Sequence, residues 1–358
     1  LLDGRGLAAP SGRAQCQSRR MNKTTRIILL ILGLALFAWF IQRTGWDDIR
    51  GTFETLGWLG LVVLIPYTIV FTIDTIGWRF TFDPTALKGI PFHVIWKIRL
   101  VGESINNVIP SMYVGGETAK IYLLKRRNVT VITATSAAVR SKTAQSVAQS
   151  TFIAMGAVVA AFTLPTEHVA MKWAFAGMAV IGFTVMALLF KIQKHGMFAT
   201  ILGWVRKLGF KLQSLVSKEE KLRELDDQIY EFYHRDQKHF RWCTFTYLIG
   251  WMFYTMEIMV VAHLLGAEMA WHHAFAMEAF ISIARGFNTV VPGALGIQEF
   301  GVVGLFALFG YGPELGTKYA VIRRGRDVVF ASLGWFAFYL GEATWKGLRE
   351  EIQQTDGE

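Results

Sequence analysis

The amino-acid sequence predicts an all-α polytopic membrane protein with about six spanning helices, two re-entrant broken-helix elements and an inverted internal repeat. Of the 358 residues, 53% are hydrophobic and 18% are charged, whereas a soluble domain carries about 25% charged residues. The apolar residues form long blocks, and a similar polar motif interrupts two of these blocks. The class is therefore a membrane protein, and no nucleic-acid partner is expected.

The two interrupting motifs are NNVIPSMYVGGE at residues 106–117 and NTVVPGALGIQE at residues 288–299. Proline removes a backbone donor and glycine loosens the chain, so neither run can continue a helix. In lipid, broken backbone persists only where protein or a watery cavity satisfies its polar groups. The sequence therefore predicts two re-entrant elements, with structural breaks at Pro110, Gly115, Gly116, Pro292, Gly293 and Gly296.

Apolar runs predict spans at residues 27–41, 58–80, 131–164, 171–190, 242–265 and 315–339. Residues 42–57 carry mixed charges and are expected to form an external connection. Basic residues before the first run place the N-terminus in the cytoplasm. An even number of crossings returns the C-terminus to the same side. The expected location is the bacterial cytoplasmic (inner) membrane.

The predicted organisation has four parts. Residues 1–21 are a disordered extension or follow from a misplaced start, residues 22–165 form the first membrane repeat, residues 166–345 form the second, and residues 346–358 are a cytoplasmic tail. Within the second repeat, residues 195–240 interleave apolar and basic side chains. This pattern is typical of an interfacial amphipathic helix on anionic lipid. A solvated connector explains it equally well.

The polar residues of the two halves match at a separation of 182 or 183 residues. The pairs are Asp74 with Glu257, Asn106 with Asn288, Pro110 with Pro292, Glu117 with Glu299, and Arg140 with Arg323. Each half has an odd number of predicted crossings, so the second half would be inverted relative to the first. Inverted repeats with broken helices place a substrate site at the repeat interface.

Charged residues inside spans are costly, at about 2.5–3.5 kcal/mol each, and usually mark a pathway. The planar fork of arginine also matches phosphate oxygens. We therefore expect a lipid head-group phosphate to bind to arginines in a central cavity, with carboxylates that balance the charge or attract an amino group. The candidate substrate-binding residues are Arg140, Arg323, Arg285, Glu117, Glu299, Asp74, Glu257, Asn106 and Asn288.

Structural roles explain several of these residues as well. Glu117 and Glu299 would stabilise helix N-termini through the macrodipole. Arg140 and Arg323 would form permanent bridges with those two carboxylates. The two asparagines would satisfy the backbone exposed at each proline break. These alternatives remain open at this stage.

Motifs for enzymatic chemistry are not found. The two cysteines, Cys16 and Cys243, have no metal or disulfide spacing. The sequence contains no His-Glu-x-x-His, no Asp-rich motif and no P-loop. We therefore expect no catalytic residue, no metal and no cofactor, and we read His272 and His273 as interfacial side chains.

The segments Asn-x-x-Ile-Pro…Gly-Gly-Glu-x-x-Lys and Val-Pro-Gly-Ala-Leu-Gly-Ile-Gln-Glu resemble the flippase-like membrane region of lysyl-phosphatidylglycerol synthases. Stand-alone relatives, including hopanoid-associated membrane proteins, share the pattern. The resemblance covers most of residues 22–345, and the family motifs map onto Gly115, Gly116, Pro292, Gly293, Gly296 and Glu299. Where the family often has an acidic residue before the arginine of the third span, this chain has Val139, which leaves the partner of Arg140 open.

The resemblance implies a flippase or carrier that moves a phospholipid or related amphiphile, with an anionic or zwitterionic head group, between leaflets. It does not imply aminoacyl transfer, which belongs to a soluble C-terminal domain of the synthases, and only a short tail follows the last predicted span here. Two alternatives are kept: a non-transporting accessory partner of a lipid or glycolipid synthase, and a membrane-embedded head-group enzyme.

Overall fold

The computed structural model describes residues 45–108, 114–164, 169–194, 237–286 and 296–340, together with residues 42, 227 and 230. Regular structure in these ranges is helical, with no strand. The elements are α2 (Trp46–Leu56), η1 (Gly57–Val63), α3 (Leu64–Arg79), α4 (Phe92–Val108), α5 (Val114–Lys125), α6 (Val131–Thr163), α7 (Val169–Lys194), α11 (Gln237–Leu264), α12 (Trp271–Gly286), α13 (Ile297–Leu308) and α14 (Pro313–Leu340). The predicted all-α class is confirmed.

Three stretches in the described part of the chain are long and apolar enough to cross a membrane: Ile49–Arg79, Val131–Thr163 and Gln237–Leu264. The expected count was about six. The predicted span at residues 27–41 and the amphipathic segment up to residue 236 lie almost wholly outside the described ranges. The apolar stretch of α7 is shorter, Val169–Thr184. Helix α14 is long, but its charged residues keep it out of this set.

Most of residues 42–57, the expected external connection, form the helix α2. In α2, the apolar residues Trp46, Ile49, Phe53 and Leu56 recur at the spacing of one helix face. Leu56 is buried, and Ile49 packs against the same core cluster. The charged residues between them occupy the other face, where Arg50 pairs with Glu54 at 2.7 Å. The mixed charge indicated only a connection, and the apolar spacing explains why this connection is helical.

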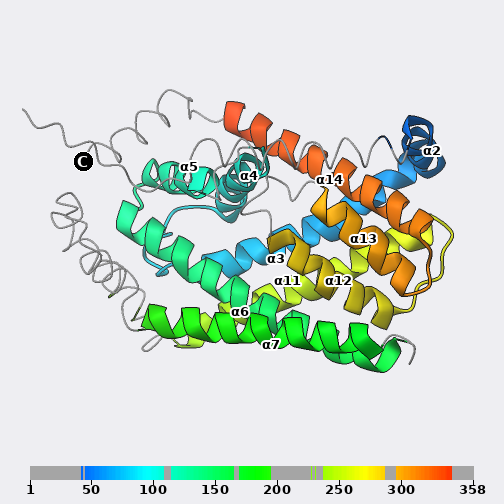
Figure 1. The fold of residues 1–358 in the computed structure, drawn as a ribbon. Coiled ribbons are helices and arrows are strands. Elements are labelled where there is room, and N and C mark those ends of the chain that lie inside the picture. Colours follow the sequence, from blue (N-terminus) through cyan, green and yellow to red (C-terminus); the bar gives the residue numbers. More distant parts are fainter. Residues whose placement is uncertain are drawn as a thin grey trace, which may run out of the picture.

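Helices α3 and α11 pack against each other near the middle of the bundle and run in opposite directions (Figure 1). Gly77 of α3 faces the ring of Tyr247, and Gly250 of α11 faces Asp74. A side chain at Gly77 would lie 3.2 Å from the Tyr247 ring. Glycine at these two positions therefore permits a close contact between the helices.

The two halves of the chain interleave. Helix α12 of the second half packs along α6 of the first, and α14 of the second half packs along α4 of the first. Both contacts depend on a glycine, because a methyl group at Gly156 would overlap Ala279, and one at Gly334 would overlap Ser104. The core is thus shared between the halves.

Helices lie on either side of each predicted break, and Gly115 and Gly116, expected in the first break, lie in α5. Helix α4 ends at Val108 and α5 begins at Val114, while α12 ends at Gly286 and α13 begins at Ile297. Pro110, Pro292 and Gly293 lie outside the described residues. A side chain at Gly116 would overlap the carbonyl oxygen of Gly102 and the side chain of Asn106, so only glycine fits there. Gly296 has φ of 79° at the N-cap of α13, a conformation that favours glycine.

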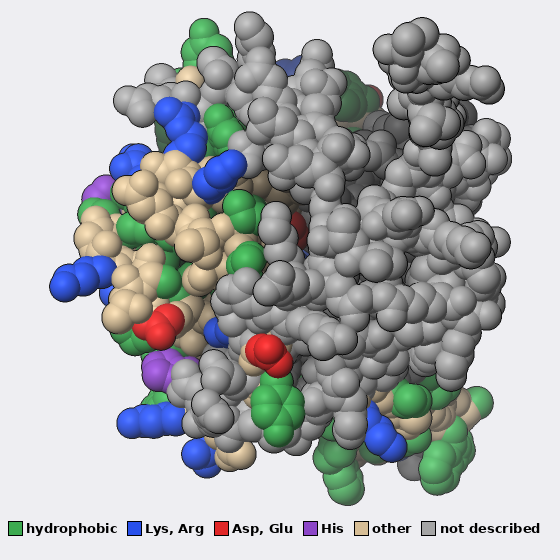
Figure 2. Space-filling view, turned by 90° about the vertical axis from the view of Figure 1, so that its left-hand side faces the viewer, with side chains coloured by type: hydrophobic (Ala, Val, Ile, Leu, Met, Phe, Trp, Pro, Cys, Tyr) green, Lys and Arg blue, Asp and Glu red, His purple; other side chains and the backbone are tan. Residues whose placement is uncertain are grey.

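The two ends of the bundle differ in charge. At one end, α3 finishes, α6 begins and α11 begins (Figure 1). Seen from this side, the described surface shows more Lys and Arg than Asp and Glu (Figure 2). Exposed residues here include Arg79, Lys88, Lys125, Arg126, Arg127, Lys238 and Arg241. At the opposite end, exposed residues include Glu54, Glu268 and Glu314.

Candidate functional site: a charged cavity between the two halves

A cavity of about 710 Å³ opens between helices α3, α4, α5, α6, α11 and α12. This volume falls within the range of ordinary ligand pockets, about 300–1,000 Å³. Among the residues that the structure describes, six charged side chains line it: Asp74, Arg99, Glu103, Glu117, Lys142 and Arg285. Three are acidic and three are basic, so the lining carries separated charges that balance.

The cavity lies at the depth of the apolar spans. Lys142 follows the first residue of α6 by about 17 Å along the helix axis. Trp251 lies half-way along α11, a helix of 28 residues. Both helices are long and apolar enough to cross a membrane. The charges of the cavity are therefore far from the ends of these two helices.

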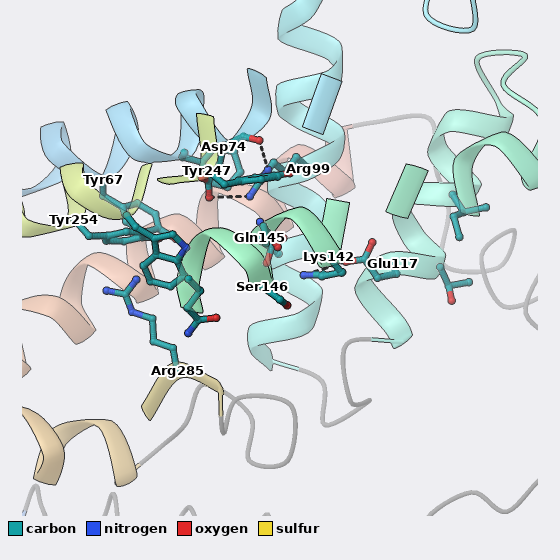
Figure 3. A pocket seen from close by; sticks show the side chains of 16 residues that line it. Tyr67, Asp74, Arg99, Glu117, Lys142, Gln145, Ser146, Tyr247, Tyr254 and Arg285 are labelled. Atoms are coloured by element: carbon teal, nitrogen blue, oxygen red, sulfur yellow. Dashed lines mark hydrogen bonds and ion pairs between the residues drawn. The ribbon is translucent and has the colours of Figure 1, made fainter. Parts of the chain in front are cut away.

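One wall contains a bridge between α3 and α4. Arg99 donates to the Asp74 carboxylate at 3.0 Å and to the Asp74 carbonyl oxygen at 2.5 Å. The guanidinium also stacks over the Phe71 ring, 5.4 Å from its centroid. Tyr247 of α11 lies beside this pair (Figure 3) and shares a hydrogen bond of 2.6 Å with Ser141. The bridge fixes Arg99 with its charge already balanced.

A second wall joins α4, α5 and α6 through lysine. The buried Lys120 ammonium lies 3.2 Å from Glu103 and 2.8 Å from Glu117. Lys142 of α6 reaches the same Glu117 oxygen at 3.5 Å, and its side chain is 42% exposed. Lys142 and Glu117 lie next to each other in the lining (Figure 3). Glu117 is therefore shared by two cations, of which Lys142 is the more accessible.

The third cation, Arg285, enters from α12 on a different side (Figure 3). Its guanidinium lies 3.9 Å from the Tyr254 ring centroid and 5.3 Å from that of Trp251. Its ionic partner is Glu278 on the same helix. Cation–π contacts hold an arginine without consuming all its donors. Arg285 is thus positioned by rings and by one carboxylate.

Aromatic rings make up much of the remaining lining, and they are Tyr67, Phe71, Tyr247, Trp251 and Tyr254. These rings line the same cavity as the charged groups. The cavity can accept both a polar head group and adjoining apolar atoms.

A second group of charges surrounds α14 and does not line the cavity. Glu278 accepts from Arg323 at 3.2 Å, and Arg323 also donates to Tyr319 at 2.9 Å. Arg326 pairs with Glu257, and Arg324 pairs with Glu299. Asp327 joins the network through Arg326 at 2.5 Å. Arg323, Arg326, Glu257, Glu278 and Glu299 are all buried.

The structure brings three of the residues selected from sequence into the cavity: Asp74, Glu117 and Arg285. Arg323, Glu257 and Glu299 belong to the buried network of the second half. Arg140 lies elsewhere and donates to the carbonyl oxygen of Thr81 at 3.1 Å, which supplies one partner for a group whose pairing the sequence left open. Asn288 lies outside the described residues.

Asn106 matches the structural alternative for that residue. Its side-chain oxygen accepts from the backbone N–H of Gly116 at 2.9 Å. Glu117 and Glu299 both occupy the first turn of a helix, α5 and α13 respectively, as the macrodipole interpretation requires. The permanent bridge of Glu299 is to Arg324, one position beyond the arginine considered from sequence.

Three charged cavity residues were missing from the sequence-based set: Arg99, Glu103 and Lys142. Two features of the sequence could have identified Arg99 and Glu103 as site residues. Arg99 and Glu103 stand four residues apart, so they share a helix face. Glu103 also matches Arg285 at the separation of 182 residues that relates the two halves. In the described ranges, no group of three or more His, Cys, Asp or Glu side chains could hold a metal ion.

The family comparison agrees with the resemblance seen in the motifs. The family model described as lysylphosphatidylglycerol synthase TM region matches residues 26–334. No curated protein and no solved structure matches the chain. The family match covers far more than half of the 358 residues. The chain therefore belongs to the lysylphosphatidylglycerol synthase TM region family, and it is a multi-pass membrane protein with a lipid-related role.

Proposed function

We propose that this protein is a flippase or carrier that moves a phospholipid or related amphiphile between leaflets. One observation carries the proposal: a cavity of about 710 Å³, lined by balanced charges and aromatic rings, lies at membrane depth between the two halves. Charged residues at such depth are costly, and they usually mark a pathway. The basic end of the bundle would face the cytoplasm, in the inner membrane of a bacterium.

The head group would occupy the charged part of the cavity. Arg285 and Lys142 offer two positions for its phosphate, because both cations line the cavity and come from different sides. Glu103 and Glu117 would receive an amino or hydroxyl group, with side chains that remain 25% and 20% exposed. A charge-balanced lining favours a zwitterionic head group over a strongly anionic one, since it gains partners for both charges.

An inverted repeat would explain how the site reaches both leaflets. The halves pack reciprocally, α12 on α6 and α14 on α4, and α3 runs opposite to α11. Glu117 and Glu299 fall in the first turn of corresponding helices. Transporters of this architecture alternate access by moving one repeat against the other. In this proposal, the buried ion pairs around α14 occupy the position in the second half that corresponds to the charged cavity in the first half.

Transport, rather than aminoacyl transfer, is what we propose for the matched membrane region. The test is leaflet exchange of head-group-labelled phospholipids in proteoliposomes. Arg285→Gln and Lys142→Gln should each slow exchange about tenfold, the effect of losing one charge-assisted hydrogen bond. The matched control is Arg140→Gln, on the same helix as Lys142 but outside the lining.

The outcomes separate the alternatives. Exchange that is slowed by both cavity variants but not by Arg140→Gln supports a phosphate path through the cavity. Exchange that neither cavity variant changes would retain transport but contradict this site. A folded protein that exchanges no lipid tested would favour an accessory partner of a lipid or glycolipid synthase.

A further inference from the structure

A second, separate cavity of about 400 Å³ lies at the basic end of the bundle. We call it the rim pocket. Its wall is mainly apolar and also holds one arginine and one histidine; the described lining residues are Ile76, Arg79, Phe80, Phe82, Pro84, Leu87, Phe92 and His239. None of its described lining residues also lines the charged cavity. It is therefore a distinct feature, formed by the end of α3, the following connection, the start of α4 and the start of α11.

The position of the rim pocket corresponds to a membrane surface. Arg79 is the last residue of the apolar stretch Ile49–Arg79, and His239 stands near the start of the stretch Gln237–Leu264. Two exposed aromatic residues, Trp242 and Phe245, follow on α11. Aromatic side chains gather at the level of lipid head groups. Apolar lining next to cations at this level matches the two parts of a phospholipid.

Arg79, the arginine of the rim pocket, is not paired with a carboxylate in the part of the chain that the structure describes. Within the ranges that the structure describes, no carboxylate pairs with Arg79, Lys88 or Lys238. The nearby Asp83 accepts from the hydroxyl and backbone N–H of Thr85, at 2.7 and 2.8 Å. These hydrogen bonds lower the pKa of Asp83, whose negative charge also acts on His239 and Arg140. Arg79 remains available to an anion.

We propose that the rim pocket binds one anionic phospholipid of the surrounding leaflet. An acyl chain would lie against Ile76 and Phe80, while the phosphate contacts Arg79 and His239. The argument is charge complementarity, because basic pockets at the ends of membrane helices attract anionic head groups. This lipid is not the transported substrate, and the proposal does not depend on transport.

The test is native mass spectrometry of the full chain, purified in detergent and supplied with phosphatidylglycerol or phosphatidylcholine. Wild type should retain phosphatidylglycerol preferentially. Arg79→Gln should lower this retention about fivefold, the effect of one surface cation on an anionic lipid. Ile76→Trp should fill the pocket from a partly exposed position and lower retention of both lipids. Lys97→Gln, an exposed cation outside the lining, is the control and should behave as wild type.

Inorganic phosphate should not displace the lipid, since it lacks the acyl chain. Equal retention of both lipids by wild type would overturn the proposal. So would unchanged retention in either Arg79→Gln or Ile76→Trp, provided that each variant elutes as a folded protein. A pocket filled by the chain's own amphipathic segment would give the first of these results.

Discussion

The two halves of the molecule use matching acidic positions in different ways. Glu117 of the first half is 20% exposed, lines the cavity and is shared between Lys120 and Lys142. Glu299 of the second half is 2% exposed and pairs with Arg324. The same motif thus places a solvent-accessible carboxylate in the first half and a buried, ion-paired carboxylate in the second. Exposure, more than residue type, distinguishes a site from a structural bridge.

A buried ion pair and a partly exposed charge respond differently when the oppositely charged partner is removed. A buried ion pair gains little net stability, but an unpaired buried charge is strongly unfavourable. A partly exposed charge is instead compensated by water. The buried network around α14 should therefore respond to charge removal by unfolding, and the charged lining of the cavity by changing its binding.

The largest effect is expected for Glu278→Ala in the second half. Glu278 is fully buried and pairs with both Arg285 and Arg323, so its removal leaves two cations with fewer partners. We expect a loss of about 3–5 kcal/mol in the free energy of unfolding. Thermal unfolding of the purified protein in detergent measures it.

The matched variant in the first half is Glu103→Ala. Its partner Lys120 keeps Glu117 at 2.8 Å, so the unfolding midpoint should change much less. Equal destabilisation by the two variants would contradict the distinction between the halves.

A smaller loss of stability is expected at the glycine contacts that join the two halves, because both halves have such a contact. Gly156→Ala and Gly334→Ala each add a methyl group that overlaps the facing helix, at Ala279 and Ser104 respectively. Overpacking of this kind costs about 1–3 kcal/mol. Both variants should lower the unfolding midpoint to a similar degree, because both contacts join a helix of one half to a helix of the other.

Gly177→Ala is the control for these two variants. Nothing lies within 4 Å of a methyl group at Gly177 in α7. Alanine there should leave stability unchanged or raise it by up to about 1 kcal/mol through helix propensity. If Gly156→Ala alone were harmful, the packing of the two halves would not be reciprocal.

The helices were largely predictable from the sequence, because long apolar blocks and proline-containing motifs determine where they begin and end. Helix α6 was expected at residues 131–164 and is found at Val131–Thr163. Helix α2 was not predicted, because the mixed charge of residues 42–57 indicated only a connection, although Trp46, Ile49 and Phe53 have the spacing of one helix face.

The candidate site was only partly predictable, because a charged residue's position along a helix does not show which way it faces. Arg140 and Lys142 are two residues apart, so their side chains point about 200° from each other around α6. Lys142 faces the cavity, while Arg140 reaches the Thr81 carbonyl oxygen. Arg323 and Arg324 differ in the same way, by about 100°. Only packing against neighbouring helices selects the face.

The smallest effect on stability, and the sharpest test of the comparison, is expected for Glu117→Gln. Lys120 keeps Glu103 at 3.2 Å, so the free energy of unfolding should change by less than about 1 kcal/mol. Lys142 loses a partner that faces the cavity, and lipid exchange in proteoliposomes should change several-fold if the cavity is the path.

Glu299→Gln should show the reverse: a lower unfolding midpoint, because Arg324 loses a buried partner, and near-normal exchange by the molecules that fold. If the two variants had the same unfolding midpoint and the same exchange rate, Glu117 and Glu299 would have the same role. The difference in exposure between the two carboxylates would then not separate a binding residue from a structural one.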